Sequence, residues 1–324
     1  MNTEINNAIK STDKDAQYDA SAKRLLGQKH ILAHILAKTV KNFIGMKPKE
    51  IVPLIEGEPY ISTVPIEPGL TNTIKSNNSE RIVGLNNENI EINEGMIRFD
   101  IIFYVNIPSA NNAKNTLSQI IINVEAQKSE PTDYDILNRA IFYVSRMISS
   151  QKGRDFENSD YNDIKQVYSI WVCMNMKENS ISHIHLAKDD IVNIHNWHGN
   201  LDLLNIIMIG LSNELPPHDD TYEVHRLLSA LLSKDLTVKE KLNIIGNEYN
   251  IPVENNLRED VSIMCNLSQG IKEEGIAIGF AESEIKIILN MHKKGFPLEQ
   301  IALATDKNID DIKAIIDNPK NKAI

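Results

Sequence analysis

Two apolar runs, at residues 97–106 and 117–127, show the alternation of positions that is typical of β-strands. One acid interrupts each run, Asp100 in the first and Glu125 in the second. The segment between them, PSANNAKN at 108–115, is rich in turn-forming residues and predicts an antiparallel hairpin. If the two strands pair, the two acids lie side by side at one end of the sheet.

The pattern in the rest of the chain predicts helices on both sides of this hairpin. The predicted elements are a helix over DASAKRLLGQKHILAHILAKTVKNFIG, irregular structure at 50–95, a helix from about Thr132 to Ser150 that Thr132 caps, strands at 165–175 and over SISHIHLA, and helices from about residue 200 onward. This order is typical of an α/β core with a helical extension.

The same pattern divides the chain into four regions. Residues 1–15 are polar and are expected to be disordered, and residues 16–200 form the predicted α/β core. Residues 201–265 are expected to form a helical extension. Residues 266–324 are expected to form a C-terminal helical tail with breaks at KKGFP and DKN.

Composition excludes several classes of protein. A net charge of −10 over 324 residues argues against coating nucleic acid through bulk positive charge, although it leaves room for a local basic groove. Two cysteines are too few for a disulfide framework or a thiolate zinc site, and they suit a reducing, cytoplasmic setting. The start of the chain has no apolar secretion signal, and the run at 203–211 is too short to span a bilayer, so we expect no membrane association.

Two acids held close together in a partly buried place repel each other, so they need a proton, a cationic side chain or a metal. Hard oxygen ligands at strand ends suit Mg²⁺, which keeps waters for chemistry on phosphates. Gln127, two residues beyond Glu125, shares its face and is a candidate for orienting the attacking water. The alternative is that each acid pairs with a structural cation, for which Arg98 and Lys128 are nearby in sequence.

Asp100 followed by Glu125-Ala-Gln127 resembles the PD-(D/E)xK nuclease signature, in the variant form of the PD-(D/E)xK nuclease family transposases, which are related to the recombination-promoting nucleases. The resemblance covers nearly the whole chain. Its blocks are YDASAKRLLGQKHILA (with Asp19 and Lys23), INEGMIRFDIIFYV, IINVEAQKSEP, ILNRAIFYVSRMISSQKGRDF, VYSIWVCMN, IMCNLSQGIKEEG and ILNMHKKGFPLEQIA.

The resemblance implies a restriction-endonuclease-like fold, with a mixed sheet flanked by helices and a metal held by Asp100 and Glu125. It implies a metal-dependent DNA endonuclease associated with transposition or recombination, using Mg²⁺, for which Mn²⁺ is a substitute. Gln127 occupies the place of the usual lysine, which removes a positive charge next to the scissile phosphate. This departure predicts slow cleavage or a compensating cation, and Lys128 on the opposite face is a poor substitute.

Basic residues follow the second acid and are candidates for binding DNA. Arg139, Tyr143 and Arg146 have i, i+4, i+7 spacing and share a helix face, so an arginine there could clamp a phosphate while Tyr143 packs beside a sugar or base. Lys152 and Arg154 could extend this basic edge. The alternative is a solvated helix face with a half-buried tyrosine.

The C-terminal tail resembles a helix-turn-helix, but its last helix carries Asp310, Asp311 and Asp317 against Lys313. A helix that reads DNA should be basic, so this tail favours contact with protein. Gly275 permits close approach of helices, and a homo-oligomer through the C-terminal helices is a further expectation.

Two rival functions use the same residues. A nuclease-fold protein that no longer cuts, and that acts as a DNA-binding or interaction module, is favoured by the missing lysine. An acid/base hydrolase acting on a small substrate has no supporting motif. The histidine pairs His30/His34, His183/His185 and His195/His198 lack the further ligands of a zinc site and are more typical of packing or surface histidines.

Overall fold

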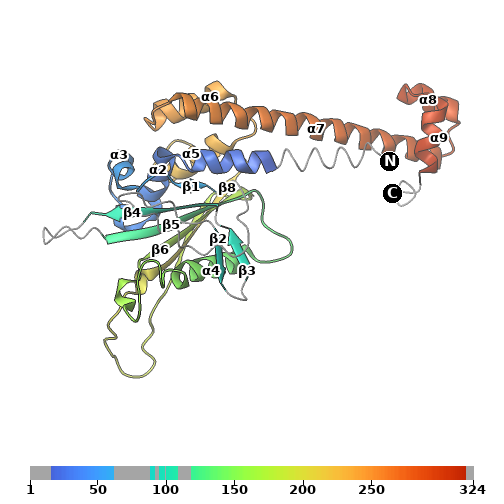
Figure 1. Cartoon of the computed structure of the whole chain (residues 1–324). Coiled ribbons are helices and arrows are strands. Elements are labelled where there is room, and N and C mark those ends of the chain that lie inside the picture. Colours follow the sequence, from blue (N-terminus) through green and yellow to red (C-terminus); the bar gives the residue numbers. More distant parts are fainter. Residues whose placement is uncertain (1–15, 62–87, 92–94, 99, 109–117, 319–324) are drawn as a thin grey trace. The chain divides into compact units, whose positions relative to one another are not determined.

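The computed structural model describes residues 16–61, 88–91, 95–98, 100–108 and 118–318 (Figure 1). The chain divides into two compact units after Cys265. The first unit contains the described residues up to 265, and the described residues from 266 to 318 belong to the second. The predicted acid pair therefore lies in the first unit.

The first unit is built on a mixed sheet with the strand order β1-β4-β5-β6-β8-β7. The strands are β1 (Tyr60–Ile61), β4 (Ile101–Ile107), β5 (Ser118–Gln127), β6 (Val167–Met176), β7 (Ser180–His185) and β8 (Leu204–Ser212). Strands β5, β6 and β8 are parallel, whereas β1/β4, β4/β5 and β7/β8 pair antiparallel. A separate hairpin joins β2 (Glu88–Glu91) and β3 (Gly95–Arg98).

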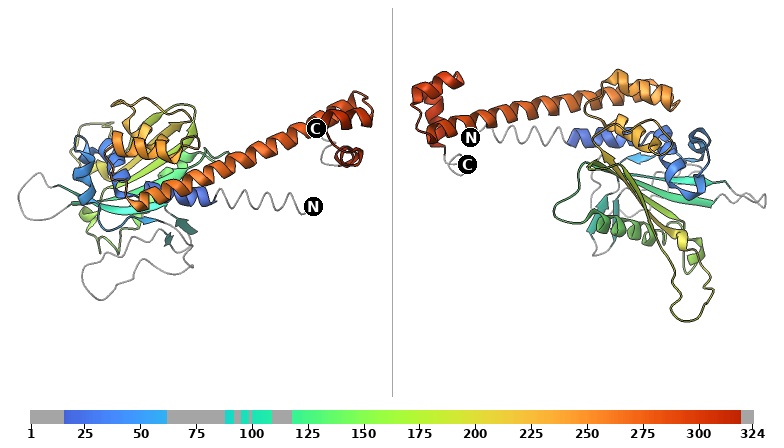
Figure 2. Two further views of the ribbon diagram at one scale, coloured as in Figure 1. Left: turned by 90° about the horizontal axis from the view of Figure 1, so that it is seen from above. Right: turned by 180° about the vertical axis from the view of Figure 1, so that it is seen from behind.

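Helices cover both faces of this sheet, which confirms the predicted α/β class (Figures 1 and 2). Helix α4 (Ile136–Ser149) packs on one face, with contacts to β6 and β8. The helix at residues 16–26, α2 (Lys29–Thr39) and α5 (Glu223–Leu232) lie on the other. Smaller helical pieces are α3 (Pro48–Ile51), α6 (Val238–Asn243) and the π-helical turn Ile244–Glu248.

The core on the α4 side forms because the apolar residues of α4 recur at helical spacing. Ile136, Ala140, Val144 and Met147 are buried against Trp171 of β6 and its neighbours. The helix begins one turn later than predicted: its N-cap is Asp135, and the Thr132 hydroxyl hydrogen-bonds to Asp133 instead. Tertiary packing of the apolar stripe therefore decides where the helix begins.

The long N-terminal helix expected from the sequence is interrupted at Gly27. The chain turns there and resumes as α2 at Lys29. A Cβ atom at Gly27 would lie 2.6 Å from Cδ1 of Ile61, so glycine permits the close approach of β1 to this turn. The break separates the helix at 16–26 from α2.

The expectation of a helical extension from residue 201 is wrong at its start. Residues Leu204–Ser212 form β8, which lies between β6 and β7 in the sheet. Ile206, Ile207 and Ile209 are all buried, on alternate faces of the strand. A strand covered on both faces is a continuous apolar run without alternation, which periodicity alone does not distinguish from a helix.

The second unit is helical. It contains the C-terminal part of α7 (Asn255–Lys293) together with α8 (Leu298–Thr305) and α9 (Ile309–Asp317). Its core is formed by Ile288, Ile301 and Ile312, one from each helix. The helices break at Gly295 and at Asp306, both with positive φ, within the predicted KKGFP and DKN segments.

The acids at the start of α9 have a local structural role. The Asn308 side chain accepts a hydrogen bond from the Asp311 N–H at 2.8 Å, and Asp310 and Asp311 occupy the first helical turn. Negative charge at a helix N-terminus is favourable because the free N–H groups there carry partial positive charge. These residues therefore stabilise α9 and keep the helix acidic.

None of the helices in the described ranges combines the length and apolar character needed to cross a bilayer.

Candidate active site

Asp100 and Glu125 lie directly opposite each other at one end of the β4–β5 pair. The register pairs Ile101 with Val124, so Asp100, in the bend just before β4, meets Glu125. The Asp100 N–H donates to Oε1 of Glu125 at 3.1 Å, and the Ala126 N–H donates to Oδ2 of Asp100 at 2.9 Å. The structure thus brings together the two acids that the alternating pattern picks out.

Glu125 lies inside the protein, on the sheet face that α4 covers. Glu125 is 2 % exposed, and its partner on the neighbouring strand β6 is Trp171. Asn123, on the same face of β5, is fully buried and donates to the Ser169 hydroxyl, to which the Trp171 indole N–H also donates at 2.9 Å. A polar layer therefore continues from Glu125 into the core and holds the carboxylate on a rigid strand.

Burial raises the pKa of both acids, and the charge of Asp100 adds to this effect on Glu125. Burial is the largest cause of the raised pKa of Asp100, and the charge of Lys23 opposes it. Burial and then the charge of Asp100 raise the pKa of Glu125 well above its ordinary value, against the smaller effects of the Asp100 N–H and of Arg139. Both acids therefore bind a proton more readily than an exposed carboxylate does.

A cation that the sequence pattern did not single out as a site residue is in contact with this pair. Lys23, from the helix at 16–26 on the other face of the sheet, lies with Nζ 2.8 Å from Oδ1 of Asp100 and 2.6 Å from Oδ2 of Asp19. Burial acts to lower the pKa of Lys23, but the attraction and hydrogen bonds of Asp100 and Asp19 outweigh it and raise that pKa to about 12. Asp19 and Lys23 have i, i+4 spacing and belong to a block of the family resemblance, but neither signal reveals the contact of Lys23 with Asp100.

Arg139 brings a second positive charge from the α4 side. Its guanidinium donates to the hydroxyls of Tyr134 and Tyr143, each at 3.0 Å. It also lies 4.9 Å from the centre of the Tyr143 ring and 5.3 Å from that of Trp171. Burial opposes the charge of Arg139, but these hydrogen bonds and the charge of Glu125 raise its pKa. The predicted face of Arg139 and Tyr143 exists, and the two side chains hold each other in place.

Arg146 is not on the surface that a nucleic acid would meet. It is 3 % exposed and lies among the buried residues of α4, beside Met147. The i, i+4, i+7 spacing places it close to the direction of Arg139, but the helix at this point is covered by the protein core. Arg146 therefore presents no exposed guanidinium in this structure, and its role in binding DNA stays a prediction.

The remaining predicted site residues differ in their surroundings. The Gln127 side-chain N–H donates to the Ser129 carbonyl at 2.8 Å, and Gln127 shares the sheet face of Glu125. Lys152 is exposed, with Nζ 6.0 Å from the centre of the Tyr161 ring. Arg154 donates to Asp155 at 2.7 Å and so belongs to a structural ion pair.

The donor set around Asp100 and Glu125 consists of hard oxygens, which fit Mg²⁺. In the described part of the chain, no three His, Cys, Asp or Glu side chains converge closely enough to hold a metal between them. Two carboxylates alone leave coordination positions for water and a phosphate oxygen, which is the usual state of catalytic Mg²⁺.

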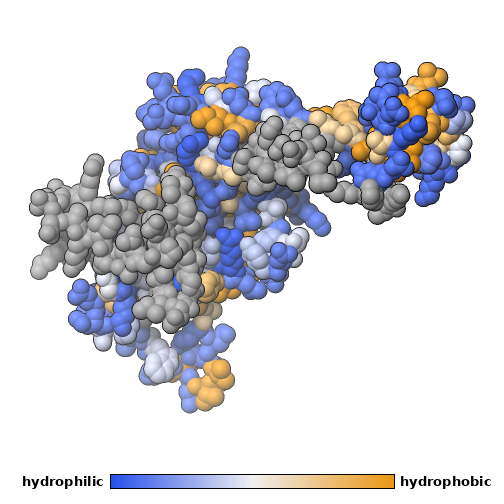
Figure 3. Space-filling view, turned by 45° about the vertical axis from the view of Figure 1, so that its right-hand side comes forward, coloured by the Kyte–Doolittle hydropathy of each residue, from blue (hydrophilic) through white to orange (hydrophobic). Residues whose placement is uncertain are grey.

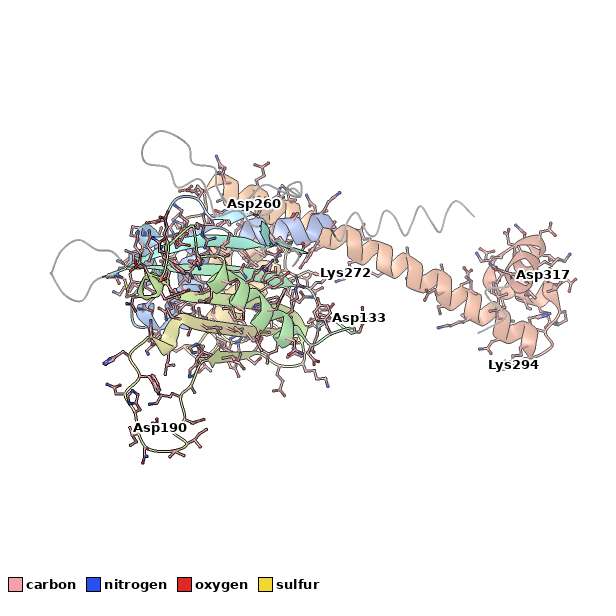
Figure 4. All side chains as sticks on the ribbon, turned by 60° about the horizontal axis from the view of Figure 1, so that its bottom comes forward. Asp133, Asp190, Asp260, Lys272, Lys294 and Asp317 are labelled. Carbon is pink, nitrogen blue, oxygen red and sulfur yellow. The ribbon has the colours of Figure 1, made fainter. Side chains whose placement is uncertain are left out.

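The histidines of the 183–198 region lie elsewhere. His183 hydrogen-bonds to the Asn205 side chain at 2.9 Å, and the His195 ring packs against Trp197. Residues 186–200 form a loop between β7 and β8, at the end of the sheet opposite Glu125, and Figure 4 places Asp190 on it. Apolar atoms of this loop are exposed in the space-filling view (Figure 3).

Comparisons with known proteins give no relative: no protein-family model, curated protein or solved structure matches the chain.

Proposed function

We propose that the protein is a metal-dependent DNA endonuclease of the PD-(D/E)xK type, associated with transposition or recombination, in which Asp100 and Glu125 hold Mg²⁺. The observation that carries this proposal is that Asp100 and Glu125 meet at one end of the β4–β5 pair, where the Asp100 N–H donates to Oε1 of Glu125 at 3.1 Å and the pKa of each acid is raised. Two carboxylates buried at one place favour a divalent cation, which takes oxygen ligands from both.

The order of the elements supports a restriction-endonuclease-like architecture. A mixed sheet with helices on both faces carries the acids at one end of its β4–β5 pair. The side chain of Asp100 is 14 % exposed, so the pair is reachable from one side while Glu125 stays inside.

Bound Mg²⁺ would supply an activated water and shield charge on the phosphodiester. The protein's own residues would do the positioning. Asp100 and Glu125 present oxygens from adjacent strands, and Gln127, whose amide N–H is bound to Ser129, keeps its amide oxygen as an acceptor for a water.

The contacts to DNA would come from the α4 side. Arg139 is held by Tyr134 and Tyr143 and projects its charge toward the acids, so it is positioned for a phosphate next to the one that is cut. Lys152 extends this edge. The acidic first turn of α9 makes the C-terminal unit a poor reader of DNA, and its part in oligomerisation stays a prediction.

The test is nicking of a supercoiled plasmid with Mg²⁺ or Mn²⁺. Asp100→Asn keeps the shape of the side chain and removes one charge, so nicking should fall at least about 100-fold relative to the wild type. The matched control is Asp190→Asn, an aspartate at the opposite end of the sheet, which should cut like the wild type. Equal nicking by wild type and Asp100→Asn would remove the assignment.

A second candidate is a nuclease-fold interaction protein that does not cut. It is favoured by the neutral Gln127 and by the contact of Lys23 with Asp100, which together satisfy part of the site without a metal. This candidate predicts that calorimetry finds no Mg²⁺ or Mn²⁺ binding that depends on Glu125.

A further inference from the structure

We propose that Lys23 is the cation of the Asp100–Glu125 site: it occupies Asp100 in the metal-free protein and supplies the positive charge that binds the scissile phosphate. The inference rests on the proposed nuclease function and assigns a residue to it. Lys23 reaches the acids from the opposite layer of the sheet, through a contact that no local pattern contains.

The geometry places the Lys23 ammonium at the open side of the acid pair. Nζ lies 2.8 Å from Oδ1 of Asp100 and 2.6 Å from Oδ2 of Asp19, and the Lys23 side chain is 17 % exposed. An ammonium has three N–H donors, and these two acceptors take two of them. Within the described residues the third donor has no acceptor, and it is the one available to a phosphate oxygen.

The other polar groups of the site do not replace Lys23. Gln127 is neutral, and its amide N–H is bound to the Ser129 carbonyl. Arg139 is anchored on the α4 side by two tyrosine hydroxyls. Cleavage builds negative charge on the phosphate, so a cation on the Asp100 side adds to the stabilisation that Arg139 gives from the other side.

Lys23 and a divalent cation compete for the same carboxylate. Oδ1 of Asp100 accepts from Lys23 and Oδ2 from the Ala126 N–H, so a metal at Asp100 shares this carboxylate with the Lys23 ammonium and is repelled by its charge. Lys23 therefore weakens metal binding while it supports cutting. A lysine that only stabilised the fold would not produce these opposite effects.

The first experiment compares Lys23→Met with the wild type and with Lys29→Met, a control lysine on α2 whose partner is the exposed Glu58. Mn²⁺ affinity is measured by calorimetry on the full chain, and cutting is measured by plasmid nicking. We expect Lys23→Met to bind Mn²⁺ several-fold more tightly and to nick roughly 100-fold more slowly. Lys29→Met should match the wild type in both.

The second experiment is a rescue. Gln127→Lys in the Lys23→Met background restores an ammonium beside Glu125, so nicking should recover at least roughly tenfold, and Lys23→Arg alone should retain most activity. Thermal unfolding of each variant shows that it is folded.

Three results would overturn the role of Lys23. They are wild-type nicking by Lys23→Met, loss of both Mn²⁺ binding and nicking in a folded Lys23→Met, and no gain from Gln127→Lys. If the wild type itself does not nick DNA, the endonuclease proposal fails separately. The Mn²⁺ affinity of Lys23→Met then still decides whether Lys23 competes at Asp100, and an unchanged affinity rejects it.

Discussion

Two buried acidic sites on the same face of β4 differ in how their charge is balanced. Asp155 is almost fully buried, with its side chain 5 % exposed, and it accepts hydrogen bonds from Tyr104, Arg154 and Lys165 at 2.7, 2.7 and 2.8 Å. Asp100, four residues before Tyr104 in the chain, is paired with Lys23 at 2.8 Å and lies beside a second buried acid, Glu125. Both sites are largely buried and both contain a lysine, but only the Asp100 site holds two acids.

The pKa shifts express this difference. Burial acts to raise the pKa of Asp155, but the charge of Arg154 and the donors Lys165 and Tyr104 outweigh it and lower that pKa. At the other site, burial and the charge of Asp100 leave the pKa of Glu125 well above its ordinary value. Asp155 has three donors for one carboxylate, whereas the other site holds two buried acids with raised pKa values, as expected for a site that binds a cation.

The largest effect on stability should come from removing the balanced acid. Asp155→Ala leaves Arg154 and Lys165 without their carboxylate in a mostly buried place, so the free energy of unfolding should fall by roughly 3–5 kcal/mol. Urea unfolding at neutral pH measures it. A loss below about 1 kcal/mol would mean that Asp155 is balanced by solvent, and the contrast between the two sites would disappear.

Mg²⁺ should stabilise the fold only when both Asp100 and Glu125 are present. Mg²⁺ at about 100 times its dissociation constant should raise the free energy of unfolding of the wild type by roughly 2.7 kcal/mol, because it binds the folded state. Glu125→Gln should show no such gain. Thermal unfolding with and without Mg²⁺ makes the comparison, and an equal gain in Glu125→Gln would place the metal elsewhere.

Removing the charge of Glu125 should itself stabilise the fold. Glu125→Gln keeps the shape of the side chain and removes a buried, incompletely balanced charge, so at pH 8 the free energy of unfolding should rise by about 1 kcal/mol or more. Plasmid nicking should be lost in the same variant. A less stable Glu125→Gln at pH 8 would show that Arg139 already balances this acid.

The contributions of Glu125 and Asp155 to stability should change with pH in opposite directions. The folded-state pKa of Glu125 is raised, so the folded protein binds the proton more tightly and its stability falls as pH rises from about 4.5 toward that raised pKa. The folded-state pKa of Asp155 is lowered, so its contribution is present above 3.8 and is lost as pH falls through the lowered value. Unfolding of Glu125→Gln and Asp155→Asn across pH 3–8 should remove the first and the second dependence respectively.

The smallest effect on stability and DNA affinity should come from removing a hydrogen bond that holds Arg139 in place. Tyr143→Phe removes one hydrogen bond of the Arg139 guanidinium and keeps the aromatic ring beside it. The free energy of unfolding should therefore fall by roughly 0.5–1.5 kcal/mol. DNA affinity at low salt should fall only a few-fold, measured by fluorescence anisotropy without metal. Arg139→Gln should weaken binding more, and equal binding by the two variants would remove Arg139 from the DNA-binding surface.

Local sequence patterns were enough to predict the two paired strands and the two acids at their end, because the alternation of side chains acts over short stretches. The strands observed at 101–107 and 118–127 agree with the expected hairpin, and the register places Asp100 opposite Glu125. The helix breaks at Gly295 and Asp306 followed from glycine and asparagine-rich turn segments in the same way. The catalytic roles of Asp100 and Glu125 stay predictions.

Other features were beyond local patterns. The run at 204–212 became a strand because parallel neighbours cover it on both sides, and its sequence contains no sign of those neighbours. Arg146 has the spacing of an exposed face, but the rest of the protein decides that its side is covered.

By itself, the sequence determined the class of fold and the two acids, since both follow from the periodicity of side chains along single elements. The tertiary structure decided which cations approach the acids. Lys23 comes from a helix 77 residues before Asp100, and Arg139 comes from the opposite layer. Charge balance depends on distances between layers, and only the packing of those layers on the sheet sets these distances.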